Sequence, residues 1–317
     1  MKHLLALSLL ALTLPATSAI AQESGTPTQA LIAYSSKTPV TLTPSNVTFK
    51  VDNRLTPVAN LAPIHANGTQ VALLLDDGLR TSIGRELNNL RAFITSLPQG
   101  TEVFVGYMQN GRVVPGGDIE GFTTNLDAAA QGIHITGGIP GASASPYFCL
   151  SDFVKNWPSR AESASAPQQQ PSHKARIVLM ITNGVDPYNG STSITNQDSP
   201  YVQAAIDDAQ RAGVPVYSIY FTDAGFRGGR GTFSGQSYLS QVADSTGGIS
   251  YYLGNGNPVT LAPYLDQFKA ALAGTYVATF LIDANKKLVA LKLATTAPKT
   301  KLRGPGEVRP GTIVLSQ

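Results

Sequence analysis

The chain has 317 residues, of which 42% are hydrophobic and only 14% charged, and this balance excludes a disordered protein. The formal net charge of +3 comes from scattered basic residues, so nothing in it requires nucleic acid or an anionic membrane as a partner. Cys149 is the single cysteine, which excludes an intrachain disulfide, and its apolar neighbours predict a buried, unreactive thiol.

Residues 1–21 have the pattern of a secretory signal peptide. Lys2 gives a basic start, residues 4–14 form a short apolar core, and the AIA sequence at 19–21 is a small-x-small cleavage site. Neither this run nor any later one reaches the roughly 20 apolar residues that span a bilayer. We therefore expect an exported protein, periplasmic or extracellular, that is not integral to a membrane. An uncleaved N-terminal anchor is the alternative.

Two regions precede the central part of the chain. Residues 22–30 are polar and predicted to be flexible. Residues 31–66 alternate between apolar and polar side chains and are interrupted by prolines, a pattern typical of edge strands and turns. This N-terminal β segment is too short to hold a core of its own, so it needs a partner sheet.

Residues 67–274 alternate between strand and helix patterns. Buried strands are predicted at 71–75, 175–182 and 214–221, a short strand at 249–253, and a hairpin in which 102–109 and 112–115 are joined by Asn110-Gly111. Helices are predicted at 81–97, 121–133, 147–157, 199–213, 237–248 and 258–274. Strands joined by helical crossovers predict an α/β, Rossmann-like fold: a mostly parallel sheet with helices on both faces. Residues 158–174, rich in Ser, Ala, Gln and Pro, predict a flexible loop within this domain.

From residue 275 to residue 317 the apolar period returns to two, which indicates a C-terminal β segment. The two β segments flank the α/β domain, and neither is large enough to fold alone. We therefore expect them to pair with each other as a small β-sandwich, with the α/β domain inserted between its halves.

Common catalytic motifs are absent: the sequence has no HExxH, GxxxxGK[ST], GxSxG or CxxC pattern. The four histidines include one in the signal segment and one in the 158–174 loop, which argues against a zinc cluster or a histidine triad. The glycine-rich stretches at 228–235 and 254–258 are interpreted as loops. We expect no enzymatic activity; an exported hydrolase with an unrecognised site is the alternative.

Carboxylates follow two of the predicted strands. Asp76 and Asp77 come directly after the run at 71–75, and Asp186 follows the run at 175–182. Because the carboxyl ends of parallel strands meet at one edge of a sheet, we expect these side chains to gather there. Oxygen ligands are those that Mg²⁺ prefers, so this edge is the candidate site.

Three stretches in this order resemble the von Willebrand factor type A domain family. VALLLDDGLR at 71–80 is similar to its strand followed by DxSxS, ARIVLMITNGVD at 175–186 to its strand ending in TDGxD, and LSQVADSTGGISYYL at 239–253 to its LxxxAxxTGGxxY element. The flanking β segments are similar to those of the acidobacterial secreted members of the family. The resemblance covers about residues 30–310 and implies an adhesion or interaction module.

Family members with an intact adhesion site bind Mg²⁺ or Mn²⁺ through the Asp-x-Ser-x-Ser loop, a Thr and a second Asp. Here Asp76 matches the first Asp, but Gly78 and Arg80 replace the two serines. Asn183 replaces the second Asp. In the loop that would carry the Thr, either Ser143 or Ser145 is the counterpart. The resemblance therefore implies a degenerate metal site.

Arg80 would place a fixed positive charge where the family holds a dication. Two unit charges about 4 Å apart interact by roughly 4 kcal/mol at an effective dielectric of about 20, so a guanidinium would oppose the metal. It would instead pair with Asp76 or Asp77. No cofactor is expected, and Mg²⁺- or Mn²⁺-dependent adhesion through a weakened site is the alternative.

We expect a non-enzymatic module that binds a protein partner through this loop rim, without an obligate metal. The predicted rim residues are Asp76, Asp77, Gly78, Arg80, Ser143, Ser145, Asn183 and Asp186. Helix capping and turn formation are the alternative roles for these residues. A further alternative is a subunit of a surface assembly that pairs through the edges of its sandwich.

Overall fold

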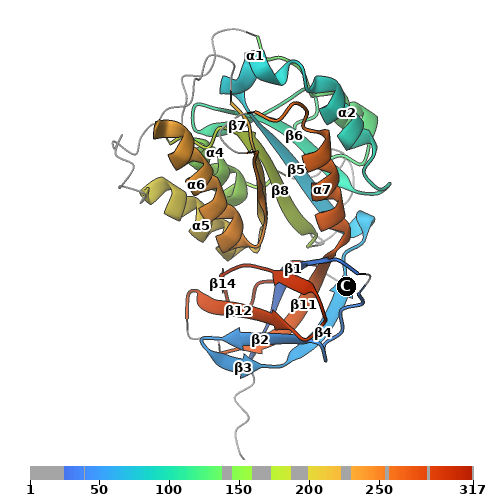
Figure 1. Cartoon of the computed structure of the whole chain (residues 1–317), viewed down its shortest axis with the longest axis vertical. Helices are drawn as coiled ribbons and strands as arrows, with labels where there is room; N and C mark the ends of the chain where they lie inside the picture. The colour runs from blue at the N-terminus through green and yellow to red at the C-terminus, as the bar shows by residue number, and fades with distance from the viewer. Residues whose placement is uncertain are drawn as a thin grey trace, which may run out of the picture.

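The computed structural model describes residues 25–38, 40–137, 145–158, 173–186, 199–222, 230–253, 257–283 and 286–315, with the backbone alone at 80–81 and 230–233. The predicted signal peptide, Ser143 and residues 159–172 of the predicted flexible loop lie outside these ranges. An α/β domain stands on a smaller β-sandwich (Figure 1).

A six-stranded sheet forms the centre of the α/β domain, in the order β10-β9-β8-β5-β6-β7. Its strands are β5 (Thr69–Asp76), β6 (Glu102–Gln109), β7 (Arg112–Pro115), β8 (Ala175–Thr182), β9 (Val216–Tyr220) and β10 (Ser250–Tyr251). All neighbours are parallel except β6 and β7. That pair is a hairpin, as predicted, whose turn residues Asn110 and Gly111 have φ values of 47° and 80°.

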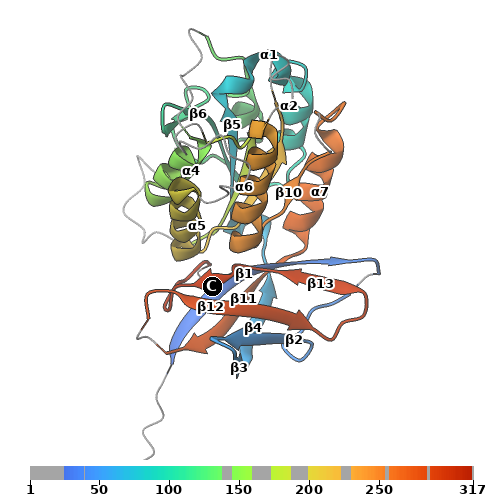
Figure 2. The ribbon, with the colours of Figure 1, turned by 60° about the vertical axis from the view of Figure 1, so that its left-hand side comes forward.

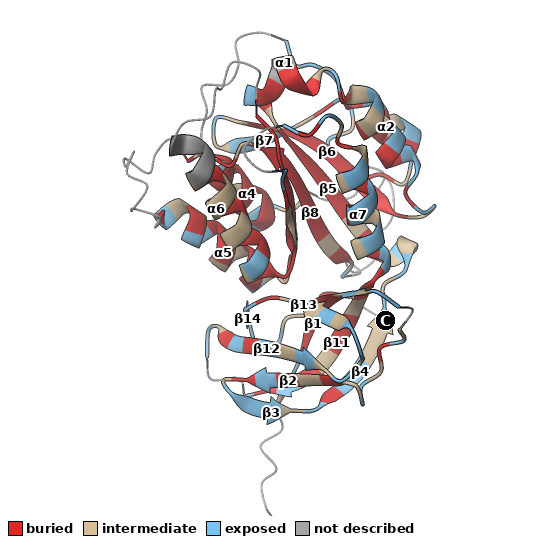
Figure 3. Ribbon diagram, in the orientation of Figure 1, coloured by how far each residue is buried: buried red, intermediate tan, exposed pale blue. Residues whose placement is uncertain are grey.

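Helices cover both faces of this sheet (Figures 1 and 2). One face carries α2 (Leu87–Thr95), α3 (Leu126–Gln131) and α7 (Ala262–Ala273), and the other carries α4 (Pro146–Lys155), α5 (Pro200–Ala212) and α6 (Arg230–Thr246). The central strands are buried on both sides, which explains their unbroken apolar runs (Figure 3). The predicted α/β fold with a mostly parallel, doubly covered sheet is confirmed.

Two antiparallel sheets make up the sandwich, in the orders β13-β1-β11-β4 and β14-β12-β2-β3. Their strands are β1 (Thr26–Ser36), β2 (Val47–Val51), β3 (Arg54–Thr56), β4 (Val58–Pro63), β11 (Thr275–Ile282), β12 (Val289–Thr295), β13 (Thr300–Arg303) and β14 (Glu307–Val308). Strands from both ends of the chain pair in each sheet, β1 with β11 and β2 with β12. Phe49 and Phe280 meet edge-to-face between the sheets, with ring centroids 4.9 Å apart. This is the sandwich that the sequence predicts.

The first strand begins earlier than expected. Residues 22–30 were predicted to be flexible because they are polar, but β1 starts at Thr26. Gln29 is buried there because its amide oxygen accepts from the backbone of Val314 and Leu315, both at 3.0 Å. The polar side chain thus bonds the far end of the chain, a contact that local sequence does not reveal.

The helix predicted at 81–97 is divided into α1 (Arg80–Ile83) and α2 (Leu87–Thr95). The buried Glu86 lies at the break, and its carboxylate accepts from the backbone N–H of Leu261 at 2.9 Å and from the side chain of Asn89 at 2.8 Å. Leu261 precedes α7, so Glu86 joins two helices that are distant in the sequence. The apolar spacing was correct for α2, but it carried no sign of this contact.

The glycine-rich stretch at 228–235 is not wholly a loop, because α6 begins at Arg230. Gly235 packs so closely on the segment after β8 that a Cβ atom there would lie 2.2 Å from the carbonyl oxygen of Asn183. A glycine at this position therefore allows the helix and the loop to pack closely.

Cys149 is buried as predicted, and burial raises the pKa of its thiol to about 12.

Candidate functional site

Asp76 ends β5 at the carboxyl edge of the sheet, and both of its carboxylate oxygens accept hydrogen bonds from the chain. The backbone N–H of Gly78 donates to Oδ1 at 2.9 Å, and the Thr182 hydroxyl donates to Oδ2 at 2.5 Å. Thr182 ends β8, the strand beside β5, so the parallel register brings the two side chains together. A Cβ atom at Gly78 would lie 3.2 Å from Asp76 Oδ1, so the glycine gives the turn room to curl back.

The charge of Asp76 is poorly compensated by the described residues. Burial raises the pKa of its carboxyl group, and the neighbouring Asp77 adds to the rise. The hydrogen bonds from Thr182 and Gly78 oppose it without cancelling it. The predicted pairing with Arg80 lies outside the described side chains, since only the backbone of Arg80 is described, at the start of α1.

Asp77 is buried beside Asp76 and belongs to the 3₁₀ turn η2 (Asp77–Leu79). It accepts a hydrogen bond from the hydroxyl of Thr136, which lies in the segment after α3. That segment is fixed to the end of β6, because the Tyr107 hydroxyl donates to the carbonyl of His134 at 2.5 Å. The loops that follow β5 and α3 therefore meet at one place.

Ser145 caps a helix instead of presenting a free hydroxyl. It is fully buried, and its Oγ accepts from the backbone N–H of Tyr147 at 3.3 Å as the N-cap of α4. The Tyr147 hydroxyl donates in turn to the carbonyl of Gly184 at 2.7 Å. This bond joins the start of α4 to the loop after β8.

Asn183 and Asp186 lie in that loop and form local contacts. The Asn183 Oδ1 accepts from the backbone N–H of Val185 at 2.9 Å, which closes an Asx turn. The buried Asp186 accepts from the Ser199 hydroxyl at 2.6 Å, and Ser199 is the N-cap of α5. Asn183 thus forms a turn and Asp186 supports a helix cap, which are roles of the kind given above as alternatives to binding.

A Mg²⁺ or Mn²⁺ ion at this site would compete with hydrogen bonds that its oxygen atoms already accept. Hard dications need several oxygen ligands with free lone pairs. The Asp76 oxygens, the Asn183 oxygen and the Ser145 hydroxyl are each engaged by a donor from the chain. Among the described residues, no group of three or more His, Cys, Asp or Glu side chains has the arrangement of a metal site.

Large apolar side chains are exposed around this polar centre, and the sequence analysis did not predict them. They are Ile135 at 51% exposure, Phe148 at 38%, Tyr252 at 48%, Leu253 at 60% and Val259 at 95%. They lie in the segment after α3, the first turn of α4, the segment after β10 and the approach to α7, all of which reach the carboxyl edge of the sheet. We call these five residues the apolar rim.

Thr182 and Thr136 were also missed. Thr182 directly precedes Asn183 and occupies the Thr position of the TDGxD-like motif, so the motif itself carried that signal. Thr136 lies 59 positions from its partner Asp77 and belongs to no motif. For this residue and for the apolar rim, only the folded arrangement of the loops gives the signal.

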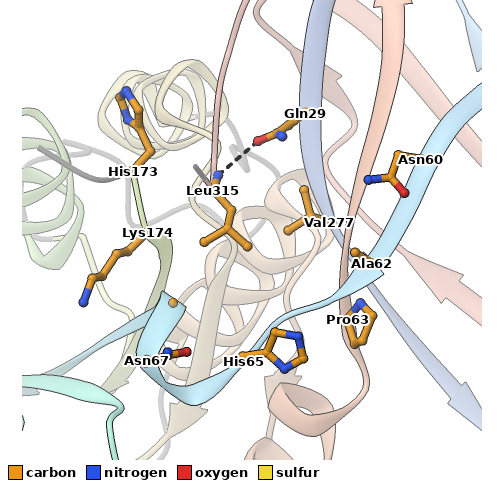
Figure 4. A pocket seen from close by; sticks show the side chains of 11 residues that line it. Gln29, Asn60, Ala62, Pro63, His65, Asn67, His173, Lys174, Val277 and Leu315 are labelled. Atoms are coloured by element: carbon orange, nitrogen blue, oxygen red, sulfur yellow. Dashed lines mark hydrogen bonds between the residues drawn. The ribbon is translucent and has the colours of Figure 1, made fainter. Parts of the chain in front are cut away.

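A separate pocket of about 370 Å³ lies at the junction of the two domains (Figure 4). Both His65 and His173 line it, but Leu315 lies between them in this view, held by its backbone bond to Gln29. The two imidazoles do not converge on a common point in this view. In the described ranges, no helix combines the length and apolar character needed to cross a membrane.

No family model matches the sequence, and no curated protein matches it. Among solved structures, a von Willebrand factor type A protein from Catenulispora acidiphila is similar, with a TM-score of 0.39, 12% identity, and coverage of 91% of this chain and 75% of that one. The human COPII coat protein Sec24c has a TM-score of 0.36 and 11% identity over 80% of this chain and 44% of its own. The N-terminal domain of TFIIH p34 has a TM-score of 0.36 and 10% identity over 64% and 98%.

At TM-scores below 0.5, these likenesses carry no weight for function. Kinship with the acidobacterial secreted proteins and descent from a metal site stay predictions. The functional proposal rests on the contacts of this chain alone.

Proposed function

We propose that this chain is an exported, non-enzymatic module that binds a protein partner through the apolar rim, without a divalent metal. One observation carries the proposal: exposed apolar side chains lie on the loops next to a polar centre whose carboxylates already accept hydrogen bonds from the chain. The signal-peptide pattern of residues 1–21 supports export.

The apolar rim has the composition of a protein contact surface. Single exposed apolar residues are normal on a protein, but a group gathered on loops at one edge indicates an interaction site. Tyr252 and Phe148 supply the aromatic side chains that are enriched at the centres of interfaces. Burying apolar surface is favourable by roughly 25 cal/mol per Å², so this edge gains free energy when a partner covers it.

The polar centre fixes the shape of this surface. Hydrogen bonds from Thr182 to Asp76, from Thr136 to Asp77 and from Ser199 to Asp186 each join two segments that are distant in the sequence. Preorganised loops lose less conformational entropy when they bind. The retained carboxylates thus act as loop anchors, the role that a metal has in an intact adhesion site.

Metal-dependent adhesion is the competing proposal, because Asp76 keeps the family's first ligand. It requires the Thr182 hydroxyl and the Gly78 N–H to release the carboxylate before a metal enters. Catalysis has less support. The hydroxyls of the polar centre, on Thr182, Thr136 and Ser199, donate to carboxylates. In the described part of the chain they contact no histidine or lysine that could act as a base.

A capture experiment tests the proposal. Immobilised wild-type protein and a Leu253→Asp/Val259→Asp variant are each incubated with envelope extract, in Mg²⁺ and in EDTA. A Leu55→Asp/Leu281→Asp variant is the matched control, because those two leucines are 71% and 53% exposed on the sandwich. We expect the rim variant to lose a partner that the wild type and the control retain equally in both buffers.

Two results would contradict the proposal. If EDTA releases the partner from the wild type, the metal-dependent alternative is favoured. If the sandwich variant loses the partner and the rim variant keeps it, the contact surface lies on the sandwich.

A further inference from the structure

A groove of about 530 Å³ lies beside the edge of the central sheet, where the second half of α7 and β10 meet the sandwich strands β1 and β13. Figure 2 shows β10 and α7 directly above the junction of these two strands. The groove lies along the second half of α7, whereas Val259 of the apolar rim precedes the start of that helix, although Tyr251 of the groove and Tyr252 of the rim are consecutive in the chain. Its apolar wall comes from small side chains, among them Ala33, Ala270 and Ala271, which leave space for a bound molecule.

Tyr251 lines this groove and carries a buried hydroxyl that lacks a hydrogen-bond partner among the described residues. The residue is only 6% exposed. Buried polar groups in folded proteins are almost always satisfied, so each exception calls for an explanation. Burial raises the pKa of Tyr251, the nearby Tyr217 adds to the rise, and the Arg303 guanidinium opposes it. The hydroxyl is therefore protonated at neutral pH and is available as a donor.

Arg303 lines the same groove and is the one charged side chain among the described residues that line it. Its Nη1 donates to Asp244 at 3.0 Å and reaches the carbonyl of Gly248 at 3.4 Å. The Asp244 side chain is 70% exposed, and exposed ion pairs of this kind contribute little stability. Because a guanidinium has five N–H donors, Arg303 keeps donors for a second anion.

We propose that this groove binds a small organic carboxylate, whose oxygens accept from the Tyr251 hydroxyl and the Arg303 guanidinium. The phenol hydroxyl can donate as well as accept and the guanidinium can only donate, so both can donate to an acceptor-rich anion. The alanine-lined wall matches a short apolar body, so an organic acid suits the groove better than inorganic phosphate does. Ser35 and Gln267 at its border add polar groups that can orient the ligand.

Ligand-observed NMR titration of the whole chain tests this site with three probes: benzoate, phenylacetate and hexanoate. Benzamide and inorganic phosphate are the matched comparisons, one without the charge and the other without the apolar body. The variants are Tyr251→Phe, which removes only the hydroxyl, and Arg303→Gln. Arg112→Gln is the control, because Arg112 is exposed on β7 and does not line the groove.

We expect at least one carboxylate to bind the wild type saturably, and benzamide and phosphate to bind about tenfold more weakly or not at all. Tyr251→Phe should weaken binding of the carboxylate about tenfold, Arg303→Gln should weaken it at least as much, and Arg112→Gln should leave it unchanged. Tyr251→Phe should also leave the Tm without ligand unchanged or higher, because it removes an unsatisfied polar atom.

Three results would overturn the proposal. The first is no saturable binding of any of the three carboxylates. The second is equal binding by the wild type, Tyr251→Phe and Arg303→Gln. The third is a lower Tm for Tyr251→Phe without ligand, which would show that the hydroxyl already has a structural partner. None of these results bears on the rim, so the two proposals fail or stand separately.

Discussion

Asp76 and Thr182 end neighbouring strands, and their hydrogen bond closes the centre of the rim. The sequence showed that Asp76, Asp77, Asn183 and Asp186 follow strands, and strand parallelism was enough to place them at one edge. It did not show which groups they bond. Those partners lie on segments that are distant along the chain, so the local sequence around each carboxylate does not predict them.

Removing the Thr182 hydroxyl should leave one oxygen of Asp76 without its donor. We expect Thr182→Val to lower the free energy of unfolding by about 1–3 kcal/mol, the cost of an unsatisfied buried acceptor. The same change in an Asp76→Asn background should cost less, because the two residues act as one unit. Urea denaturation of the four proteins in this double-mutant cycle measures the coupling, and additive effects would show that the bond contributes nothing.

Asp76→Asn should stabilise the protein at neutral pH. A carboxyl group whose folded pKa lies above 3.8 favours folding most when it is protonated, and this contribution is lost as the pH rises from 3.8 through the folded pKa. The Tm of the variant relative to wild type should therefore increase with pH from about pH 4 towards neutrality.

Asp52→Asn is the control of opposite sign, because a hydrogen bond from Lys286 lowers the pKa of Asp52. The ionised carboxylate of Asp52 favours folding at pH values above 3.8. The Asp52→Asn variant should therefore lose stability relative to wild type as the pH rises. Thermal melts from pH 3 to 8 test both signs. A Tm difference for Asp76→Asn that falls as the pH rises would show that the folded state favours its charged form.

Glu86 joins α2 to the start of α7 through its carboxylate, although it lies outside the predicted rim. The apolar spacing at 81–97 predicted one helix, and the strand and helix patterns elsewhere placed β5, β8, α5 and α7 correctly. The sequence failed where a polar side chain bonds a distant backbone group, as at Glu86 and at Gln29. Such contacts leave no periodic signal.

Glu86→Ala should remove the acceptor for the Leu261 N–H and loosen the start of α7. We expect a loss of about 1–3 kcal/mol in the free energy of unfolding and faster hydrogen exchange in the first turn of α7. Asp266→Ala is the control on the same helix, since Asp266 is 70% exposed and its change should stay within about 0.5 kcal/mol. Equal effects of the two substitutions would contradict the role given to Glu86.

The sandwich has a core of its own, but some of its residues also belong to a core of the α/β domain. Leu31 of β1, Val277 of β11 and Val314 near the C-terminus pack in the same apolar cluster as the face of the central sheet that α7 covers. The pairing of the chain's two ends was predictable, because neither β segment holds enough apolar residues to fold alone. The extent of packing between the domains was not predictable, because this packing brings together surfaces that are distant along the chain.

This shared core predicts a single unfolding transition. Trp157 is the only tryptophan and stacks on Phe122 inside the α/β domain, so its fluorescence reports that domain alone. Far-UV circular dichroism reports the whole chain. We expect the two urea curves to coincide. A fluorescence midpoint that differs from the dichroism midpoint would show that the domains unfold independently.

The central claim for the whole molecule is that the rim is held by its own hydrogen bonds and works without a metal. Calorimetric titration of the purified protein with Mg²⁺ and with Mn²⁺ tests this claim most directly. We predict no saturable heat, because the Asp76 oxygens are engaged by Gly78 and Thr182. A saturable one-site signal of micromolar strength, lost in Asp76→Asn, would contradict the account.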